Sequence, residues 1–227
     1  MHKTRAAIEG LGREGFVVPT DITKPGDVKN LTERTLEHFG RVDVLVNNSG
    51  IGGPSAPLWE IDLPDWEETF AVNVTGTYLC CQAFLPSMIE RKSGSVIIIS
   101  SMSGKRPLWG RTPYAASKMA LIGLARTLAV EVGPLGIRVN LISPGAVEGE
   151  RIEWVISKQA KGRGISTDQA RRELVSGAPL ERLVPPGDVA SAAVFLASDA
   201  ASFVTGTLLM ADGGWTATDG RFTPPGM

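Results

Sequence analysis

Three side chains that could transfer a proton lie close together near the middle of the sequence: Ser101, Tyr114 and Lys118. A phenol works as a general acid or base only when its pKa, about 10 in water, approaches the working pH. Lowering the pKa of Tyr114 to ~7–8 requires roughly 3–4 kcal/mol in favour of the phenolate, and a nearby ammonium acts in that direction. This combination suits the interconversion of an alcohol and a carbonyl, with Ser101 holding the substrate oxygen.

The flanking sequence indicates how these side chains would be positioned. Thr112 is a good helix N-cap and is followed by proline, so a helix should begin there. Tyr114 and Lys118 then lie one turn apart on the same face of that helix. Residues 94–100 form a short apolar, β-branched run typical of a buried strand. Ser101 would lie at the carboxyl end of that strand, where open α/β sheets bind their ligands.

Hydrophobic periodicity alternates between helix and strand along almost the whole chain. Strands separated by helices imply a parallel sheet covered by helices on both faces, and the length of 227 residues favours one α/β domain spanning 1–227. A proline at 86 should bend or break the long central helix. We expect helices at 3–11, 24–39, 64–91, 112–132 and 186–197, a mostly helical polar segment at 148–177, and strands at 16–19, 42–47, 94–100, 137–143 and 207–211.

Composition excludes several classes of function. The balance of 23 basic and 24 acidic residues provides no field to attract nucleic acid or an anionic membrane. No apolar run approaches membrane-spanning length and the amino-terminal Met-His-Lys-Thr-Arg has no hydrophobic signal region, so we expect a cytoplasmic protein. Cys80 and Cys81 are adjacent and should pack in the core, and His2 and His38 are too scattered for a metal site.

Further motifs follow one another in order along the chain. Residues 47–50 read Asn-Asn-Ser-Gly, residues 73–76 read Asn-Val-Thr-Gly and residues 143–145 read Ser-Pro-Gly. Together with Ser101 and the Tyr-x-x-x-Lys pair, they resemble the single-domain branch of the short-chain dehydrogenase/reductase family over essentially the whole chain. The resemblance implies a Rossmann-like, doubly wound sheet and an NAD(P)-dependent oxidoreductase that interconverts a secondary alcohol and a ketone.

The resemblance also implies a role for each matching residue. Tyr114 would be the catalytic acid/base, Lys118 would lower its pKa and hydrogen-bond the nicotinamide ribose, and Ser101 would orient the substrate. Asn73 would be the fourth member, holding a water that connects Lys118 to solvent. NAD or NADP would also be contacted by Asp21 and Ile22 at the adenine ring, Asn48 and Gly50 at the adenosine ribose, and Pro144, Gly145 and Val147 at the nicotinamide. A simpler alternative is that Asp21 caps the following helix.

The amino-terminal part departs from the family pattern. The family opens with a strand, a glycine-rich turn and a helix that receives the cofactor pyrophosphate. Residues 10–15 match Gly-x-Gly-x-x-Gly literally, but they end an expected helix and so should form its C-cap and turn. We therefore expect that the first βαβ portion is absent, that Met1 is an internal start and that the edge of the strand at 42–47 is exposed. The residue that chooses between NAD and NADP would lie in the missing part.

The substrate is less defined than the chemistry. Residues 148–177 should form a lid over the nicotinamide side of the cleft, with Met102, Trp109 and Trp154 either lining an apolar wall or packing in the core. The resemblance fits a 3-oxoacyl-carrier-protein reductase, or a dehydrogenase acting on a sugar alcohol, hydroxy acid or cyclic alcohol. The basic residues of the lid could bind a phosphorylated or carrier-linked substrate, or could simply be solvated: Lys158, Lys161, Arg163, Arg171 and Arg172.

The expected partners are small molecules and further copies of the chain. The helix at 112–132 is apolar almost all round, which predicts deep burial or a homo-oligomer, a dimer or tetramer as is usual in the family. An alternative is a catalytically impaired short form that acts only as an oligomer partner of full-length subunits. An isomerase or dehydratase using the same tyrosine and lysine is a third possibility, but such relatives usually carry a longer substrate domain.

Overall fold

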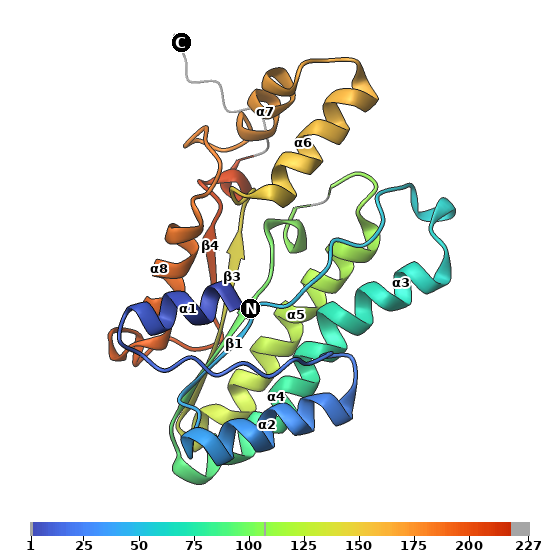
Figure 1. The fold of residues 1–227 in the computed structure, drawn as a ribbon. Coiled ribbons are helices and arrows are strands. Elements are labelled where there is room, and N and C mark those ends of the chain that lie inside the picture. Colours follow the sequence, from blue (N-terminus) through green and yellow to red (C-terminus); the bar gives the residue numbers. More distant parts are fainter. Residues whose placement is uncertain (1, 107, 219–227) are drawn as a thin grey trace.

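The computed structural model describes residues 2–106 and 108–218 (Figure 1). Four parallel strands form one sheet in the order β1-β2-β3-β4, so each strand pairs with its successor along the chain. Parallel neighbours need a crossover between them, which the intervening helices supply. The strands are β1 (Val44–Asn47), β2 (Gly94–Ile99), β3 (Ile137–Pro144) and β4 (Leu208–Ala211).

Helices cover both faces of this sheet (Figure 1). α4 and α5 pack on one face, α2 packs on α4, and α8 packs against β2, β3 and β4 on the other face. α6 and α7 form a separate hairpin beyond the carboxyl ends of the strands. The helices are α1 (His2–Gly10), α2 (Pro25–Phe39), α3 (Leu63–Phe70), α4 (Gly76–Arg91), α5 (Thr112–Val132), α6 (Glu150–Arg163), α7 (Thr167–Val175) and α8 (Pro186–Ala197).

The core follows the alternation of side chains along β2 and β3. Val96 and Leu141 point to the side of α4 and α5, whereas Ile97 and Ile142 pack against Leu196 of α8. All five are fully buried, as expected for the near-continuous apolar runs of a parallel sheet covered on both faces. The expected α/β architecture is therefore confirmed. Among the described residues, no helix is both long enough and apolar enough to cross a bilayer.

The two cysteines lie in this core, as expected. Cys80 and Cys81 are free thiols on α4, and both are buried. Burial raises the pKa of the Cys80 thiol, and burial together with the neighbouring Cys80 raises the pKa of Cys81 to about 12.

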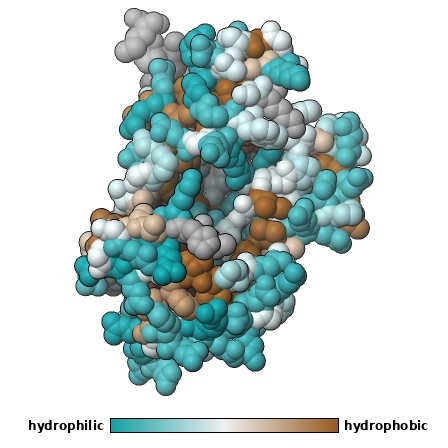
Figure 2. All heavy atoms as spheres, viewed as in Figure 1, coloured by the Kyte–Doolittle hydropathy of each residue, from teal (hydrophilic) through white to brown (hydrophobic). Residues whose placement is uncertain are grey.

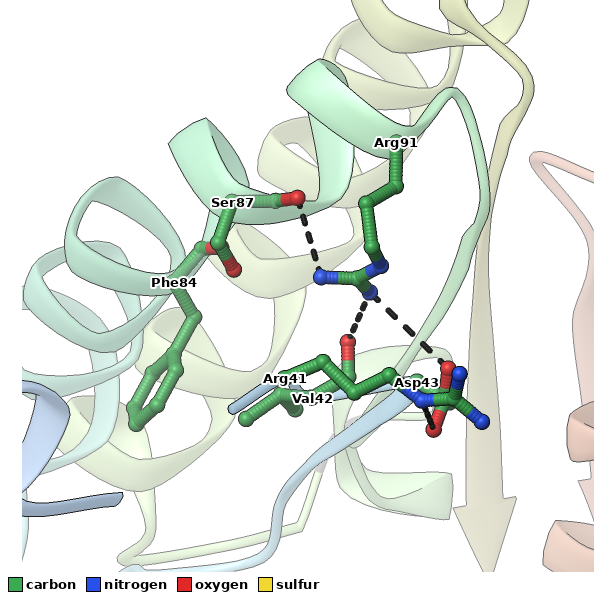
Figure 3. Close-up of polar contacts among 6 residues, drawn as sticks. All are labelled: Arg41, Val42, Asp43, Phe84, Ser87 and Arg91. Carbon is green, nitrogen blue, oxygen red and sulfur yellow. Dashed lines mark hydrogen bonds and ion pairs between the residues drawn. The ribbon is translucent and has the colours of Figure 1, made fainter. Parts of the chain in front are cut away.

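A side-chain clamp fixes the start of β1. Arg91, the last residue of α4, donates hydrogen bonds to the carbonyl oxygens of Ser87 and Val42 and lies 3.9 Å from a carboxylate oxygen of Asp43 (Figure 3). Arg41 pairs with the same carboxylate at 3.2 Å. The clamp ties the carboxyl end of α4 to the chain entering β1.

The strand expected at 16–19 is wrong. Within the described residues this segment has no neighbouring strand, and a β-strand depends on a partner for its ladder of backbone hydrogen bonds. Phe16 instead stacks on His38 of α2, with ring centroids 4.4 Å apart. In the same part of the chain β1 pairs with β2 alone, which leaves Val44 38% and Val46 47% exposed. Figure 2 shows hydrophobic side chains at the surface over β1.

Three local expectations have different outcomes. Residues 10–15 end α1 in a turn in which Leu11 N donates to Ile8 O and Gly12 adopts a φ of +72°, so the expected C-cap role is confirmed. Thr112 is not the N-cap of α5: Arg111 holds that position, because its carbonyl already accepts the bond from Ala115 N. The helix around Pro86 does not end there, and α4 runs on to Arg91.

Candidate active site

Tyr114 and Lys118 lie one turn apart in the first half of α5, beside the carboxyl end of β2. The ammonium nitrogen of Lys118 is 5.8 Å from the centroid of the Tyr114 ring and donates a hydrogen bond of 2.9 Å to Ile99 O. Lys118 is only 5% exposed, whereas Tyr114 is half-buried. Within residues 2–106 and 108–218, the Tyr114 hydroxyl forms no hydrogen bond, so it remains available to a bound molecule.

Burial determines the electrostatic state of Lys118. Removal from water, with a smaller contribution from the positive charge of Arg151, lowers the pKa of this lysine from 10.5 to about 8. Lys118 therefore releases its proton in a range where enzymes work, and its charge at neutral pH is held at a cost to the folded state.

This cost predicts how stability depends on pH. The folded-state pKa lies below that of the unfolded chain, so the unfolded chain binds more protons between pH 8 and 10 and stability rises with pH there. Relative to Lys118→Met, the wild-type free energy of unfolding should increase by about 1.4 kcal/mol from pH 7 to pH 9. Urea denaturation of both proteins at the two pH values measures the difference. Lys105→Met, at an exposed position after β2, is the matched control, and an equal pH dependence of all three proteins would contradict the prediction.

Ser101 is positioned by the turn that follows β2. Its hydroxyl accepts a hydrogen bond from Ser103 N and donates to Ser103 Oγ, both at 3.2 Å, within the 3₁₀ turn Met102–Gly104. A Cβ at Gly104 would lie 3.0 Å from the carbonyl of Lys118, so glycine lets this turn pack directly on α5. Ser100 Oγ donates to the same carbonyl at 2.9 Å. These contacts hold the start of the turn against the helix that carries Tyr114 and Lys118.

Asn73 ties the loop after β1 to the same helix. It is fully buried in a turn of π-helix, Ala71–Thr75, and its side chain accepts a hydrogen bond of 2.8 Å from Ile51 N. The amide nitrogen donates to Ile51 O at 3.1 Å and to Ser117 Oγ at 3.0 Å. Side-chain hydrogen bonding by Asn73 therefore fixes the loop, while its expected contact with a water stays a prediction.

Gly50 shows how closely that loop approaches the basic residue. A Cβ at this position would lie 3.1 Å from Asn73 Oδ1 and 3.4 Å from Lys118 Nζ. A side chain here would crowd both groups, so glycine lets the backbone of the loop pack directly against Asn73 and the ammonium of Lys118.

The residues expected at the adenosine part of the cofactor lie near the end of β1 and in the turn before α2. Ile22 and Asn48 come together, although they are distant in sequence, and line one cavity of about 140 Å³ at the end of β1. Asp21 is exposed and its carboxylate accepts hydrogen bonds from the backbone and hydroxyl of Thr23, which lower its pKa. Asp21 thus organises the turn before α2 but is not the N-cap, which is Lys24. The remaining cavity residues are Leu31, Leu45, Val46, Asn47, Ser49, Thr77, Cys80 and Phe84.

Residues 144–147, at the end of β3 and just after it, are fixed by contacts with the chain that follows β4 and with Val184. Gly145 N donates to Ala211 O at 3.0 Å, and a Cβ at Gly145 would lie 3.0 Å from Asp212 Cα. Val147 forms a parallel bridge with Val184. Pro144 ends β3 immediately after Ser143, whose buried hydroxyl has no hydrogen-bond partner within the described residues. The three expected nicotinamide contacts therefore lie in one backbone run at the carboxyl end of the sheet.

The residues expected at the substrate differ in exposure. Met102 is buried beneath the turn after Ser101, whereas Trp109 is 81% and Trp154 61% exposed. Trp109 is thus not a core residue, and a wall formed by the two tryptophans stays a prediction. In Figure 2 the surface is hollowed between the α6–α7 hairpin and the rest of the molecule.

Two of the basic residues of the α6–α7 hairpin pair with its own carboxylates. Arg163 lies 2.6 Å from a carboxylate oxygen of Glu173, and Arg171 pairs with Glu153. These pairs join α6 to α7, so they hold the hairpin together and leave Arg163 and Arg171 less suited to bind a carrier. The side chain of Lys158 lies outside the described residues.

Two arginines that sequence reasoning missed complete the site. The guanidinium carbons of Arg111 and Arg151 lie 5.1 and 5.6 Å from the centroid of the Tyr114 ring. Arg111 donates to Gly52 O at 2.8 Å, and burial is the main cause of its lowered pKa, with opposing contributions from Tyr114 and Arg151. Neither belongs to the motif, and Arg151 is brought in from the start of α6. The only signal in the sequence was the position of Arg111 three residues before Tyr114.

Comparison with known proteins places this geometry in context. A family described as Enoyl-(Acyl carrier protein) reductase matches residues 1–216. A cis-4-hydroxycyclohexanecarboxylate dehydrogenase of Sinomonas cyclohexanicum is 36% identical over 211 residues, covering 93% of this chain and 80% of the relative. A 3-oxoacyl-[acyl-carrier-protein] reductase of Chlamydia pneumoniae is 33% identical, covering 92% and 80%. The crystal structure of an NAD⁺-bound xylitol dehydrogenase superimposes with a TM-score of 0.89 at 29% identity, covering 94% and 84%.

Proposed function

Because the chain belongs to the short-chain dehydrogenase/reductase family of NAD(P)-dependent oxidoreductases, we propose that it interconverts a secondary alcohol and a ketone with Tyr114 as the acid/base. The single observation that supports this proposal best is the buried ammonium of Lys118, one turn from a phenol whose hydroxyl forms no hydrogen bond among the described residues. A buried charge that is costly to keep beside a polar group is typical of a catalytic site.

Each residue has a distinct task in this reaction. During alcohol oxidation, Tyr114 Oη takes the proton of the substrate hydroxyl, and in the reverse direction it returns a proton to the carbonyl oxygen. Lys118 supplies positive charge next to the developing phenolate, and Ser101 Oγ redirects to the substrate oxygen the hydrogen bond that it donates to Ser103 Oγ. Asn73 positions the loop that carries Gly50.

The chain's own residues also account for cofactor binding. When bound, NAD or NADP supplies or accepts the hydride. Lys118 would hold the nicotinamide ribose, with Pro144, Gly145 and Val147 at the carboxamide, and Gly50 would let the loop backbone approach the adenosine ribose. Ile22 and Asn48 would contact the adenosine part from the cavity at the end of β1, with Asp21 beside them.

Activity with a defined panel of substrates tests the proposal. The change in nicotinamide absorbance should be followed with 4-hydroxycyclohexanecarboxylate, 3-hydroxybutanoate, xylitol and an acetoacetyl thioester, each with NAD(H) and NADP(H). The first and last of these correspond to the named substrates of the relatives. Turnover of at least one is expected. No turnover of any, by a folded protein that binds either cofactor, would overturn the assignment.

We further propose that the chain forms a dimer or tetramer, within one domain whose α6–α7 hairpin is the substrate lid. The outer faces of α4 and α5 support self-association, because Tyr78, Met119 and Val130 are 47%, 49% and 76% exposed. Light scattering after gel filtration should therefore give a mass two or four times 24.1 kDa. A mass of one chain at micromolar concentration would exclude this assembly.

A further inference from the structure

Three cationic groups lie near the ring of Tyr114, and none of them has a carboxylate partner among the described residues. Lys118, Arg111 and Arg151 all direct their cationic groups towards the ring, at 5.8, 5.1 and 5.6 Å from its centroid. In residues 2–106 and 108–218, no aspartate or glutamate oxygen lies within 4 Å of either guanidinium. Other arginines of the hairpin do have such partners.

The two guanidiniums converge on one point. A Cβ at Gly52 would lie 2.9 Å from Arg151 Nη2 and 3.1 Å from Arg111 Nη2. Two like charges held this close repel each other. Burial is the main cause of the lowered pKa of Arg111, and the charge of Arg151 lowers it further. Arg111 lies at the start of α5 and Arg151 at the start of α6. The two guanidiniums are therefore brought together by the fold and not by proximity in the sequence.

Such a pair is suited to an anion. Guanidinium groups present planar, forked donors that match a carboxylate, and arginine keeps its charge when it is partly removed from water. An anionic group between them would relieve the repulsion and would sit beside the phenol. A neutral substrate would leave both guanidinium groups without a negatively charged partner.

We propose that Arg111 and Arg151 bind a carboxylate of the substrate, so that the enzyme acts on a hydroxy acid and its oxo acid. This inference rests on the proposed oxidoreductase function and names its substrate class. Arg151, which is exposed at the start of the hairpin, makes the first contact, and the half-buried Arg111 fixes the carboxylate next to Tyr114. The reaction itself is unchanged: the carbinol carbon loses hydride to the nicotinamide and the hydroxyl loses its proton to Tyr114.

Binding of an unreactive pair of compounds tests the proposal without turnover. Cyclohexanecarboxylate and cyclohexanecarboxamide have nearly the same shape but differ in charge, and each is titrated by calorimetry with and without NAD⁺. The carboxylate should bind at least about tenfold more tightly, the gain expected from charge-assisted hydrogen bonds to arginine. Equal affinity for the two compounds under both conditions would overturn the proposal, even if the protein proves to be an active dehydrogenase.

Variants of Arg151 locate the effect. Arg151→Gln should reduce the preference for carboxylate over carboxamide about tenfold, and Arg151→Lys should restore part of it by returning the charge without the fork. Arg126→Gln removes the same charge from an exposed position on α5 and should keep the full preference. With reactive pairs, the ratio of kcat/KM for 3-hydroxybutanoate to that for its amide should follow the same order. A preference for carboxylate over carboxamide that survives in Arg151→Gln would contradict the assignment of the carboxylate to Arg151. A stronger preference for a phosphate monoester would contradict the proposed hydroxy acid substrate.

Tight carboxylate binding without turnover of any hydroxy acid would reject the proposed reaction and retain the anion site. Turnover of neutral alcohols with no carboxylate preference would retain the proposed reaction and reject the anion site. The two proposals therefore fail separately.

Discussion

Tyr114→Phe is expected to lower kcat by about 10²–10⁴-fold, the contribution that general acid–base catalysis by one positioned side chain makes. The substitution removes only the hydroxyl oxygen, which forms no hydrogen bond within the described residues, so the ring contacts with Arg111 and Lys118 should persist. The free energy of unfolding should change little. Steady-state rates by nicotinamide absorbance and urea denaturation of the same preparation measure both effects.

The chain provides an ideal control for this variant. It contains two tyrosines, and the other, Tyr78, is 47% exposed on α4. Tyr78→Phe removes the same atom and should keep wild-type activity. If Tyr114→Phe retained more than a tenth of kcat, another residue would be the proton carrier. If the wild type itself has no turnover but associates with active subunits of a related enzyme, the alternative role as an oligomer partner gains support.

Asn73→Ala is expected to cost roughly 2–4 kcal/mol of unfolding free energy, because a buried group that loses its partner costs about 1–3 kcal/mol. The backbone N–H and C=O of Ile51 would both lose their partner, and Ser117 Oγ would lose the hydrogen bond that it accepts from Asn73 while it keeps the one that it donates to Tyr114 O. The loop bearing Gly50 would then no longer be fixed beside Lys118. We therefore expect kcat/KM to fall at least tenfold, even at a temperature where the variant remains folded.

Asn140→Ala separates these two effects. Asn140 is equally buried, and its side chain bonds Val204 O and Thr207 N, away from α5 and the loop after β1. It should lower the free energy of unfolding by a similar amount without reducing kcat/KM at low temperature. Denaturation and kinetics of both variants at 10 °C provide the comparison. An Asn73→Ala protein with normal kcat/KM would show that the loop is held by other contacts.

Local patterns were sufficient to predict most elements and the central pair. Tyr114 and Lys118 are four residues apart on one helix, so their proximity follows from helix geometry alone. The apolar runs that became β2 and β3 are buried on both faces, which makes their periodicity easy to interpret. The turn at residues 10–15 was recognisable because its glycines follow a helix and do not open one.

Features that depend on distant contacts were not predictable. The segment at 16–19 has the composition of a strand, but no composition can supply the neighbour that a strand needs. Arg151 reaches the ring of Tyr114 only because α6 returns across the carboxyl end of the sheet. Asn73 was assigned a water by resemblance, whereas its bonds to Ile51 and Ser117 join three separate segments.

The burial of Cys80 and Cys81 has a practical consequence for studying the hairpin. Maleimides react with thiolates, and thiols that are covered and held protonated react slowly. These are the only two cysteines of the chain, so a cysteine introduced at the exposed position of Asp168 would provide a single labelling point. A fluorophore attached there would report movement of α7 during substrate binding, with both native cysteines left in place.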